Sequence, residues 1–398
     1  MSNDTTANVK EKMILFLICP IIAFLYSLQD VKTRSSYLVF FLICILFGWM
    51  FVADFEAADS FRYKNEFLSF AVSPDYNMKF ALESYFSENS LDKDIYHKCL
   101  YWLAAKIGGN NYHFFFLLGA VVFSFFFLKS MKYVTDNPNF QQGFYCMVLL
   151  FLFAYSNPIF NINGIRFWTA SWVGVYVLFK LVVDHNYWYF LLLVLLPTMH
   201  ISMFLLWAVF ALSWLLRSHI NGLIPLLFIS FLISASSLLL VNYFQSFLPP
   251  VLYKLIWSYT QSSNALDRLN SEGVLYAQVL NYLPTLLLML MTFLLIYNHK
   301  KIVSKKSREV FGFYLAFFTI INFLSAIPSV GRFTYLTIPF LIYVWVDNFE
   351  ITRKYNKYVL LVPVAYAYSF LYFIRNMSAV SDTVFYLTPL PFQIFYHL

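Results

Sequence analysis

The chain has 398 residues, of which 61% are hydrophobic, 22% aromatic and only 12% charged. Soluble domains carry about 25% charged residues, so this composition excludes an ordinary soluble protein. The net charge of +7 comes from basic residues between apolar runs, which membrane topology explains better than a nucleic-acid partner does. Barrel strands need apolar and polar residues in alternation, and LVFFLICILF at 38–47 shows none. We therefore predict an all-α, polytopic helical membrane protein.

Apolar runs that could cross a membrane as helices recur along the chain. The candidate spans, in chain order, are 13–29, 37–53, 112–128, 142–158, 165–183, 222–241, 275–297, 309–327, 332–349 and 357–375. The stretch 187–216 exceeds the roughly 20 residues that one span needs, and Pro197 and His200 interrupt its middle. We interpret it as a hairpin that either spans twice or is re-entrant. Together the segments predict about 12 membrane segments in one membrane domain, residues 1–398.

Basic residues predict the orientation of these spans. With the hairpin in place, the loops KKIVSKKSR at 300–308 and TRKYNK at 352–357 fall on a side that carries more Lys and Arg than Asp and Glu. The positive-inside rule makes this side cytoplasmic. Both termini are then expected outside a bacterial cytoplasmic membrane, together with two longer extracytoplasmic loops at 54–111 and 242–274.

The first outer loop contains a candidate helix of its own, DIYHKCLYWLAAKIGG at 94–109. Its residues Tyr101, Trp102 and Ala105 are expected to share one face. A helix with an apolar aromatic face of this kind lies in the plane of the membrane surface. We therefore expect 94–109 to rest on the outer surface of the membrane.

Several charged or polar residues fall in the two outer loops. The segment ADSFRY places Asp59, Arg62 and Tyr63 at the start of the first loop, and Arg268 lies in the second. Each of them can be explained as an ordinary solvated loop residue. Their shared placement on one membrane face is what makes them candidates for binding a substrate at that face.

Arg166 is the most unusual charged residue, because NINGIRFWTASW at 161–172 surrounds it with apolar, aromatic and small residues. A charge at such a place is costly and marks a candidate functional site. Ala170 and Gly174 follow on roughly the same helix face, and small residues let a neighbouring helix approach closely. Arg166 is therefore expected to point into the bundle. The alternative is an arginine whose side chain snorkels to the outer headgroups.

Two further residues lie at the outer ends of spans. His200 falls in the hairpin turn PTMHIS, and Arg332 opens a late span after a proline and a glycine. A histidine in a turn is by itself more often a structural group. Guanidinium groups, however, bind phosphate oxygens in a fixed fork, and a carboxylate or neutral imidazole can take a proton from a hydroxyl. A reaction between a diphosphate-linked donor and a hydroxyl acceptor would use both kinds of group.

Two motifs carry a resemblance to a known family. The run NINGIRFWTASWVGVYVLFKLVV, followed after a polar connector by YFLLLVLLPTMHISMFLL, resembles the EpsG family of bacterial exopolysaccharide proteins. That family has an Asn-x-x-Arg span start and, later, a His-x-Ser turn. Asn163 with Arg166, and His200 with Ser202, match this pattern.

Shorter matches extend the resemblance over about residues 13–375. An Asp-Ser/Thr-x-x-Tyr element of the family is similar to residues 59–63, and a late Gly-Arg-Phe is matched at 331–333. One position departs from the pattern: the residue after the arginine is often Gln in the family and is Phe167 here. A hydrogen-bonding side chain is therefore missing at that position.

The resemblance implies a Wzy-like polysaccharide polymerase. Such a protein joins oligosaccharide repeat units carried on undecaprenyl diphosphate into O-antigen, capsule or exopolysaccharide, on the outer face of the cytoplasmic membrane. The implied partners are the lipid-linked oligosaccharide, membrane lipid and a chain-length regulator. No cofactor, metal ion or nucleic acid is expected.

Each candidate residue has an expected role in this reaction. Arg166 and Arg332 are expected to bind the donor diphosphate. His200 is the expected base, and Asp59 either orients sugar hydroxyls or acts as an alternative base. The remaining candidates for substrate binding are Arg62, Tyr63, Asn163, Ser202 and Arg268.

Three other functions stay open from the sequence. An O-antigen-ligase-like enzyme would differ only in its acceptor. A flippase of lipid-linked oligosaccharides would also need arginines, but transporters often carry inverted repeats, and no convincing repeat is visible. A membrane acyltransferase would favour a membrane-embedded histidine with a cytosolic acyl donor, whereas His200 is expected outside.

Overall fold

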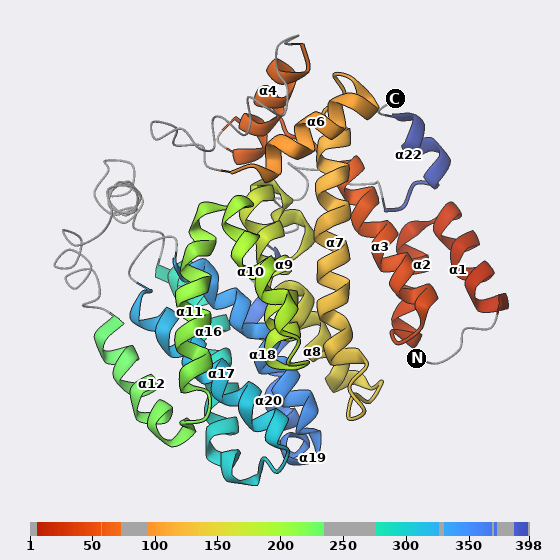
Figure 1. Cartoon of the computed structure of the whole chain (residues 1–398). Helices are drawn as coiled ribbons and strands as arrows, with labels where there is room; N and C mark the ends of the chain where they lie inside the picture. Colours follow the sequence, from red (N-terminus) through yellow and green to blue (C-terminus); the bar gives the residue numbers. More distant parts are fainter. Residues whose placement is uncertain are drawn as a thin grey trace, which may run out of the picture. The chain divides into compact units, whose positions relative to one another are not determined.

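The computed structural model describes residues 6–56, 58–72, 94–234, 275–325, 330–367, 370–371 and 386–396. Every regular element within these ranges is a helix, which confirms the predicted all-α class (Figure 1). The chain divides into two compact units, each described here by itself. The first comprises the described residues of Met1–Leu150, Asn157–Leu206 and Phe370–Leu398; the second comprises those of Phe151–Ser156 and Trp207–Ser369. The single membrane domain stays a prediction.

The first unit carries the N-terminal helices, the two helices of the first outer loop and the helix of Arg166. Its elements are α1 (Thr6–Ile18), α2 (Pro20–Ser27), η1 (Leu28–Asp30), α3 (Arg34–Trp49), α4 (Asp59–Val72), α6 (Tyr96–Gly108), α7 (His113–Thr135), η2 (Ile159–Gly164), α9 (Ile165–Val182), η3 (Tyr187–Tyr189), α10 (Phe190–Leu195), η4 (Leu196–Thr198), η5 (Ile201–Met203) and α22 (Leu390–Tyr396). Two helices belong partly to each unit: α8 (Phe144–Tyr155) and α11 (Phe204–Leu216).

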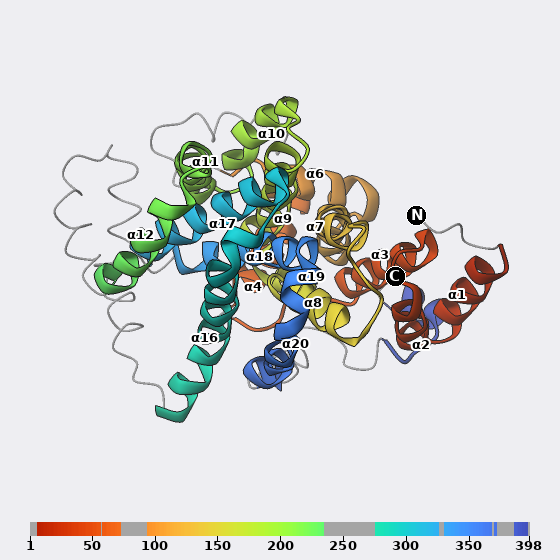
Figure 2. The ribbon, with the colours of Figure 1, turned by 90° about the horizontal axis from the view of Figure 1, so that it is seen from below.

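The second unit contains the later apolar helices. Its elements are α12 (Ile220–Ser234), α16 (Leu275–Asn298), η7 (His299–Lys301), α17 (Lys305–Phe323), η8 (Val330–Phe333), α18 (Thr334–Asp347), α19 (Phe349–Thr352), η9 (Arg353–Tyr355) and α20 (Asn356–Val359). Within this unit α17 packs against α12 and α18, and Figure 2 shows the long helix α16.

Most predicted spans coincide with helices of the structure. Three described stretches are long and apolar enough to cross a membrane: His113–Thr135, Phe144–Val182 and Leu283–Lys301. The other apolar helices are shorter; Arg34–Trp49, for example, has 16 residues. At 1.5 Å per residue this helix covers about 24 Å of a hydrocarbon core of about 30 Å. The chain is therefore a helical membrane protein, and the number of about 12 segments stays a prediction.

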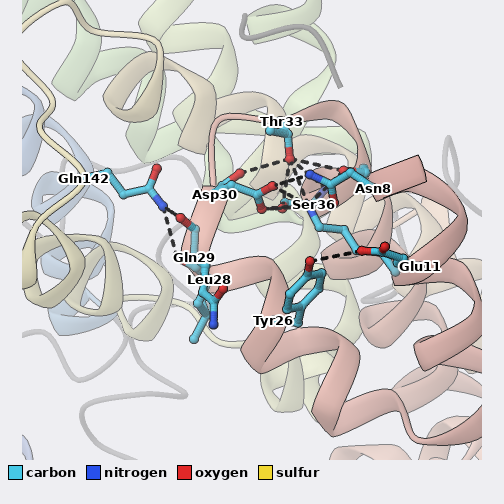
Figure 3. A network of polar contacts seen from close by, with 11 residues as sticks. Asn8, Glu11, Tyr26, Leu28, Gln29, Asp30, Thr33, Ser36 and Gln142 are labelled. Carbon is cyan, nitrogen blue, oxygen red and sulfur yellow. Dashed lines mark hydrogen bonds and ion pairs between the residues drawn. The ribbon is translucent and has the colours of Figure 1, made fainter. Parts of the chain in front are cut away.

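Residues 13–29 do not form the single span predicted from their composition. The helix stops at Cys19, which is extended, and Pro20 begins α2 because it has no N–H to continue α1. Tyr26 of α2 donates a hydrogen bond to Glu11 of α1 over 3.2 Å, so the chain reverses between the two helices (Figure 3). We call α1 and α2 the N-terminal hairpin.

A buried ammonium group closes the N-terminal hairpin. Lys12 is fully buried, and its Nζ lies 2.6 Å from Asp30 Oδ1 and within 3.2 Å of the hydroxyls of Thr33, Ser35 and Ser36. Figure 3 shows Asp30, Thr33 and Ser36 converging on this point. Lys12 and Asp30 therefore lie at the same end of the hairpin, and the expectation of an N-terminus on the opposite side from Asp30 is wrong.

Two other predicted segments are interrupted. Within 187–216 α10 ends at Leu195 and α11 begins at Phe204. Two 3-10 turns lie between them, with His200 extended, which confirms the predicted break. The described part of 357–375 is also not one helix, because α20 ends at Val359 and a turn at Leu360 precedes Pro363.

The described residues of the first outer loop form two helices, α4 and α6, which contact each other. Figure 1 shows α4 and α6 at one end of α7, and α6 packs against both. The predicted surface face of α6 is wrong in one respect: Tyr101 is buried against Phe67 and Phe115, whereas Trp102 is exposed. Consecutive residues point about 100° apart on a helix, so these two aromatics do not share a face. The loop 242–274, with Arg268, lies outside the described residues.

The core formed by α3 and α7, next to α4 and α6, is rich in aromatic residues. Phe47 of α3 and Phe115 of α7 are almost completely buried, and Gly48 allows the two helices to cross closely. A Cβ atom at Gly48 would lie 2.5 Å from Ala120 Cβ, which is too close for any side chain. This packing supports the end of the first unit at which α4 and α6 lie.

Candidate active site

Arg166 lies in the first turn of α9, and its guanidinium group has two well-defined partners. Nη1 donates a hydrogen bond to Asp94 Oδ2 over 2.8 Å, and Nε donates one to the Tyr63 hydroxyl, also over 2.8 Å. The guanidinium carbon lies 5.2 Å from the centre of the Tyr63 ring. Arg166 is only 19% exposed and Asp94 only 5%. The arginine therefore points into the protein, and the snorkelling alternative does not hold.

Small residues on α9 allow this inward orientation. Ala170 is fully buried, and a Cβ atom on Gly174 would lie 2.9 Å from Leu206 Cδ2 and 3.5 Å from Leu196 Cδ1. The prediction that Ala170 and Gly174 permit a close neighbour is confirmed.

Asp94 links the arginine to the turn that carries His200. Its Oδ1 accepts a hydrogen bond from the Ile201 N–H over 3.1 Å, while Oδ2 accepts the bond from Arg166. The neighbouring Ile95 N–H donates to the Thr198 carbonyl over 2.8 Å. Residues 94–95 therefore hold the turn at both of its ends.

Ser202 holds the His200 ring by hydrogen bonds. Its Nδ1 accepts a hydrogen bond from the Ser202 N–H over 3.2 Å and lies 2.7 Å from the Ser202 hydroxyl. Because Nδ1 accepts, the neutral imidazole carries its proton on Nε2. The ring of Phe167 meets the imidazole edge-on, with ring centres 5.4 Å apart. The phenylalanine that replaces the family's frequent glutamine thus packs on the candidate catalytic histidine.

Tyr63 is a neutral phenol in this environment. Burial raises the pKa of Tyr63, Arg166 partly offsets this effect and Asp59 adds to it. Nε of Arg166 donates to the phenol oxygen, so Tyr63 contributes to the site as an acceptor for the guanidinium. Tyr63, predicted as a substrate-binding residue, contacts Arg166 directly.

Asp59 and Arg62 lie on the solvent-exposed face of α4. They form an ion pair of 3.2 Å with side chains that are 54% and 52% exposed. Asn163 Oδ1 accepts a hydrogen bond from the Ser60 N–H over 3.1 Å, and this bond fastens the first turn of α4 to η2. The two motifs around Asp59 and Asn163 are therefore neighbours in space, although about 100 positions separate them in the chain.

Two other arginines are predicted to bind the substrate, Arg332 and Arg268. Arg332 lies in η8 of the second unit and is exposed, and Arg268 lies outside the described residues. Their proposed contact with the substrate of Arg166 stays a prediction. Among the described residues, no group of three His, Cys, Asp or Glu side chains could hold a metal ion.

Asp94 is the member of the site that sequence reasoning missed. It stands at the beginning of an amphipathic helix, where an acidic residue is commonly explained by the helix dipole. Its partner Arg166 lies 72 positions further along the chain. Only an expectation that a buried arginine needs a carboxylate could have drawn attention to the acidic residues of the outer loops.

The fold and this cluster define an all-α membrane protein with a buried arginine–carboxylate pair beside a histidine turn. The model of the EpsG family matches residues 38–390, which include every residue of the cluster. The chain belongs to the EpsG family and is thus a membrane protein of polysaccharide biosynthesis. No curated protein and no solved structure matches the chain.

Proposed function

We propose that this protein is a polymerase that joins undecaprenyl-diphosphate-linked oligosaccharide repeat units on the outer face of the bacterial cytoplasmic membrane. The observation that carries the proposal is the fixed guanidinium of Arg166, held by Asp94 and Tyr63 next to the His200 turn. A guanidinium fixed in advance loses little freedom when it binds a planar or tetrahedral anion. Lipid-linked sugar diphosphates offer such an anion at the membrane surface.

The reaction is a glycosyl transfer with a diphosphate leaving group. A hydroxyl oxygen of the acceptor unit bonds to the anomeric carbon of the donor chain, and the bond from that carbon to the diphosphate oxygen breaks. The hydroxyl proton passes to a base as the new bond forms. Undecaprenyl diphosphate leaves, and Arg166 stabilises its charge.

Asp59 is the better-supported base of the two sequence candidates. The neutral imidazole of His200 carries its proton on Nε2, which suits a hydrogen-bond donor toward the diphosphate. Asp59 presents a half-exposed carboxylate one helical turn from Tyr63. Its neighbour Arg62 would orient the carboxylate and the sugar. A chain-length regulator and annular lipid are proposed partners.

Reconstituted protein tests this proposal. Purified protein in liposomes is incubated with lipid-linked repeat units, and the products are separated by size. The wild type is expected to give a ladder, whereas Arg166→Lys should shorten or abolish it while the protein still accumulates, because lysine keeps the charge but lacks the fork. Lys180→Arg is the control, since Lys180 pairs with Asp184 at the other end of α9 and should leave the ladder unchanged.

The alternatives predict different products in the same assay. A ligase-like enzyme would transfer the glycan to an acceptor without a lipid diphosphate and would give no ladder. A flippase would move labelled repeat units across the bilayer without joining them. A normal ladder from Arg166→Lys and Arg166→Ala alike would remove Arg166 from the proposed mechanism.

A further inference from the structure

One carboxylate connects two candidate groups that are distant in the chain. Asp94 Oδ2 lies 2.8 Å from Arg166 Nη1, and Asp94 Oδ1 lies 3.1 Å from the Ile201 nitrogen. The same side chain is 5% exposed, so water does not replace either partner. The position of the guanidinium is thus coupled to the backbone beside His200 through a single rigid group.

A second hydrogen bond also holds the His200 turn next to Asp94, and here residue 95 donates and the turn accepts. The Ile95 N–H donates to the Thr198 carbonyl over 2.8 Å. His200 lies between the two anchored positions, Thr198 and Ile201, and its imidazole is further restrained by Ser202 and Phe167. Movement of the Asp94 carboxylate would therefore move the histidine turn.

Both oxygens of Asp94 already accept hydrogen bonds, from Arg166 and from Ile201. A carboxylate that is engaged and buried in this way is a poor candidate for proton transfer. Its two bonds instead fix the geometry of the groups that it joins. Catalysis is sensitive to such geometry, because a displacement of about 1 Å can lower a rate by about 10²-fold.

We propose that Asp94 is the positioning residue of this site, holding the Arg166 guanidinium and the His200 turn at a fixed separation. This inference rests on the proposed function, because the two groups act together only if one substrate contacts both. Asp94 acts through Arg166 and His200 and does not itself touch the reacting atoms.

The substitution Asp94→Glu distinguishes a positioning role of Asp94 from a purely stabilising one. In Asp94→Glu the carboxylate can still pair with Arg166, but the extra methylene shifts the carboxylate relative to the turn. Asp94→Glu is expected to unfold at nearly the wild-type temperature and to lose about 10- to 100-fold in kcat per folded molecule. Asp94→Asn, which loses the ion pair, is expected to lose both stability and kcat, with a higher KM for the lipid-linked donor.

The ion pair of the N-terminal hairpin provides a control. Asp30→Asn also breaks an ion pair of the first unit, with the buried Lys12, but among the described residues Asp30 pairs only with those of the N-terminal hairpin and the start of α3. It should lower the unfolding temperature and leave kcat per folded molecule unchanged. All rates are measured on the folded, monodisperse fraction from size exclusion in detergent, so a poorly folding variant still gives a value.

Two results would overturn the positioning role. One is a wild-type kcat per folded molecule in Asp94→Asn, and the other is recovery of both stability and kcat in Asp94→Glu, which would make Asp94 a purely stabilising residue. Failure of the proposed function looks different, because the wild type itself would then give no ladder.

Discussion

Two ion pairs in the first unit, each with one almost completely buried member, differ in where their partners come from. Lys12 and Asp30 lie 18 positions apart, and the hydroxyls around them belong to Thr33, Ser35 and Ser36. All of these residues fall within one short stretch of chain. Lys12 is completely buried. The pair is therefore a local contact that fastens the N-terminal hairpin to the start of α3.

The pair of Arg166 and Asp94 is assembled from distant segments. Its partners are Tyr63 on α4 and the backbone of Ile201, and Arg166 keeps 19% of its side chain exposed. In the Lys12–Asp30 pair, nearby hydroxyls already satisfy the buried ammonium group, so its burial is explained without a bound ligand. A pair that joins four segments and remains partly accessible combines a fixed charge with access for an anion, as a binding site requires.

The largest expected effect concerns the side of the membrane on which the chain begins. Because the N-terminal hairpin returns to its starting end, Lys10→Cys and Arg34→Cys should behave alike in a variant without the four native cysteines. The positive-inside rule predicts that the basic side is cytoplasmic, so both should resist an impermeant thiol reagent in intact cells and react after permeabilisation. Glu56→Cys, in the loop that is predicted to lie outside, is the control expected to react in intact cells. Labelling of Lys10→Cys alone in intact cells would contradict the hairpin.

Removing the cation from each pair should give unequal losses. Arg166→Ala leaves the almost completely buried carboxylate of Asp94 without its cation, and the expected loss of unfolding free energy is about 3–5 kcal/mol. Lys12→Ala should cost less, because Asp30 is more exposed and keeps Asn8 and Ser36 as donors. Thermal unfolding in detergent measures both. Equal losses, or a loss of polymer per folded molecule in Lys12→Ala, would remove the distinction between the pairs.

Substitutions at His200 test the role of the imidazole beside the second pair. The amide nitrogen of glutamine reaches about as far as Nε2 and can donate a hydrogen bond, so His200→Gln should stay within about tenfold of the wild-type rate. His200→Asn is too short and should lose about 10²-fold or more, and Asp59→Asn should lose the base. The polymerisation assay in liposomes measures all three. Equal losses in His200→Gln and His200→Asn would instead assign His200 as the base.

The smallest effects should come from single hydrogen-bond partners. Tyr63→Phe removes one acceptor of the Arg166 guanidinium but keeps the ring, and is expected to cost about 1.5–3 kcal/mol of stability. Ser36→Ala removes one of several oxygens around Lys12 and should cost about 1 kcal/mol or less. Denaturant unfolding compares them. A Ser36→Ala loss above that of Tyr63→Phe would contradict the redundancy of the Lys12 cluster.

The sequence located most of the site but not its connections. Arg166 was recognised because a charge within an apolar run is rare, and His200 because a proline and a histidine break an overlong apolar stretch. Asp94 could not be recognised in the same way, since an acidic residue before an amphipathic helix is ordinary. The error at 13–29 has a similar origin: hydropathy measures the length of an apolar run but does not reveal that the chain turns back at Pro20.

The sequence by itself determined the class of this protein. Composition alone requires helices in lipid, because backbone polar groups must be satisfied within each segment, and the local motifs place it in its family. Only the tertiary structure decided what Arg166 holds. The packing of α6 on α7 and of α4 on α6 places Asp94 and Tyr63 beside the Arg166 guanidinium. Pairing across 72 positions depends on that packing, which no local pattern encodes.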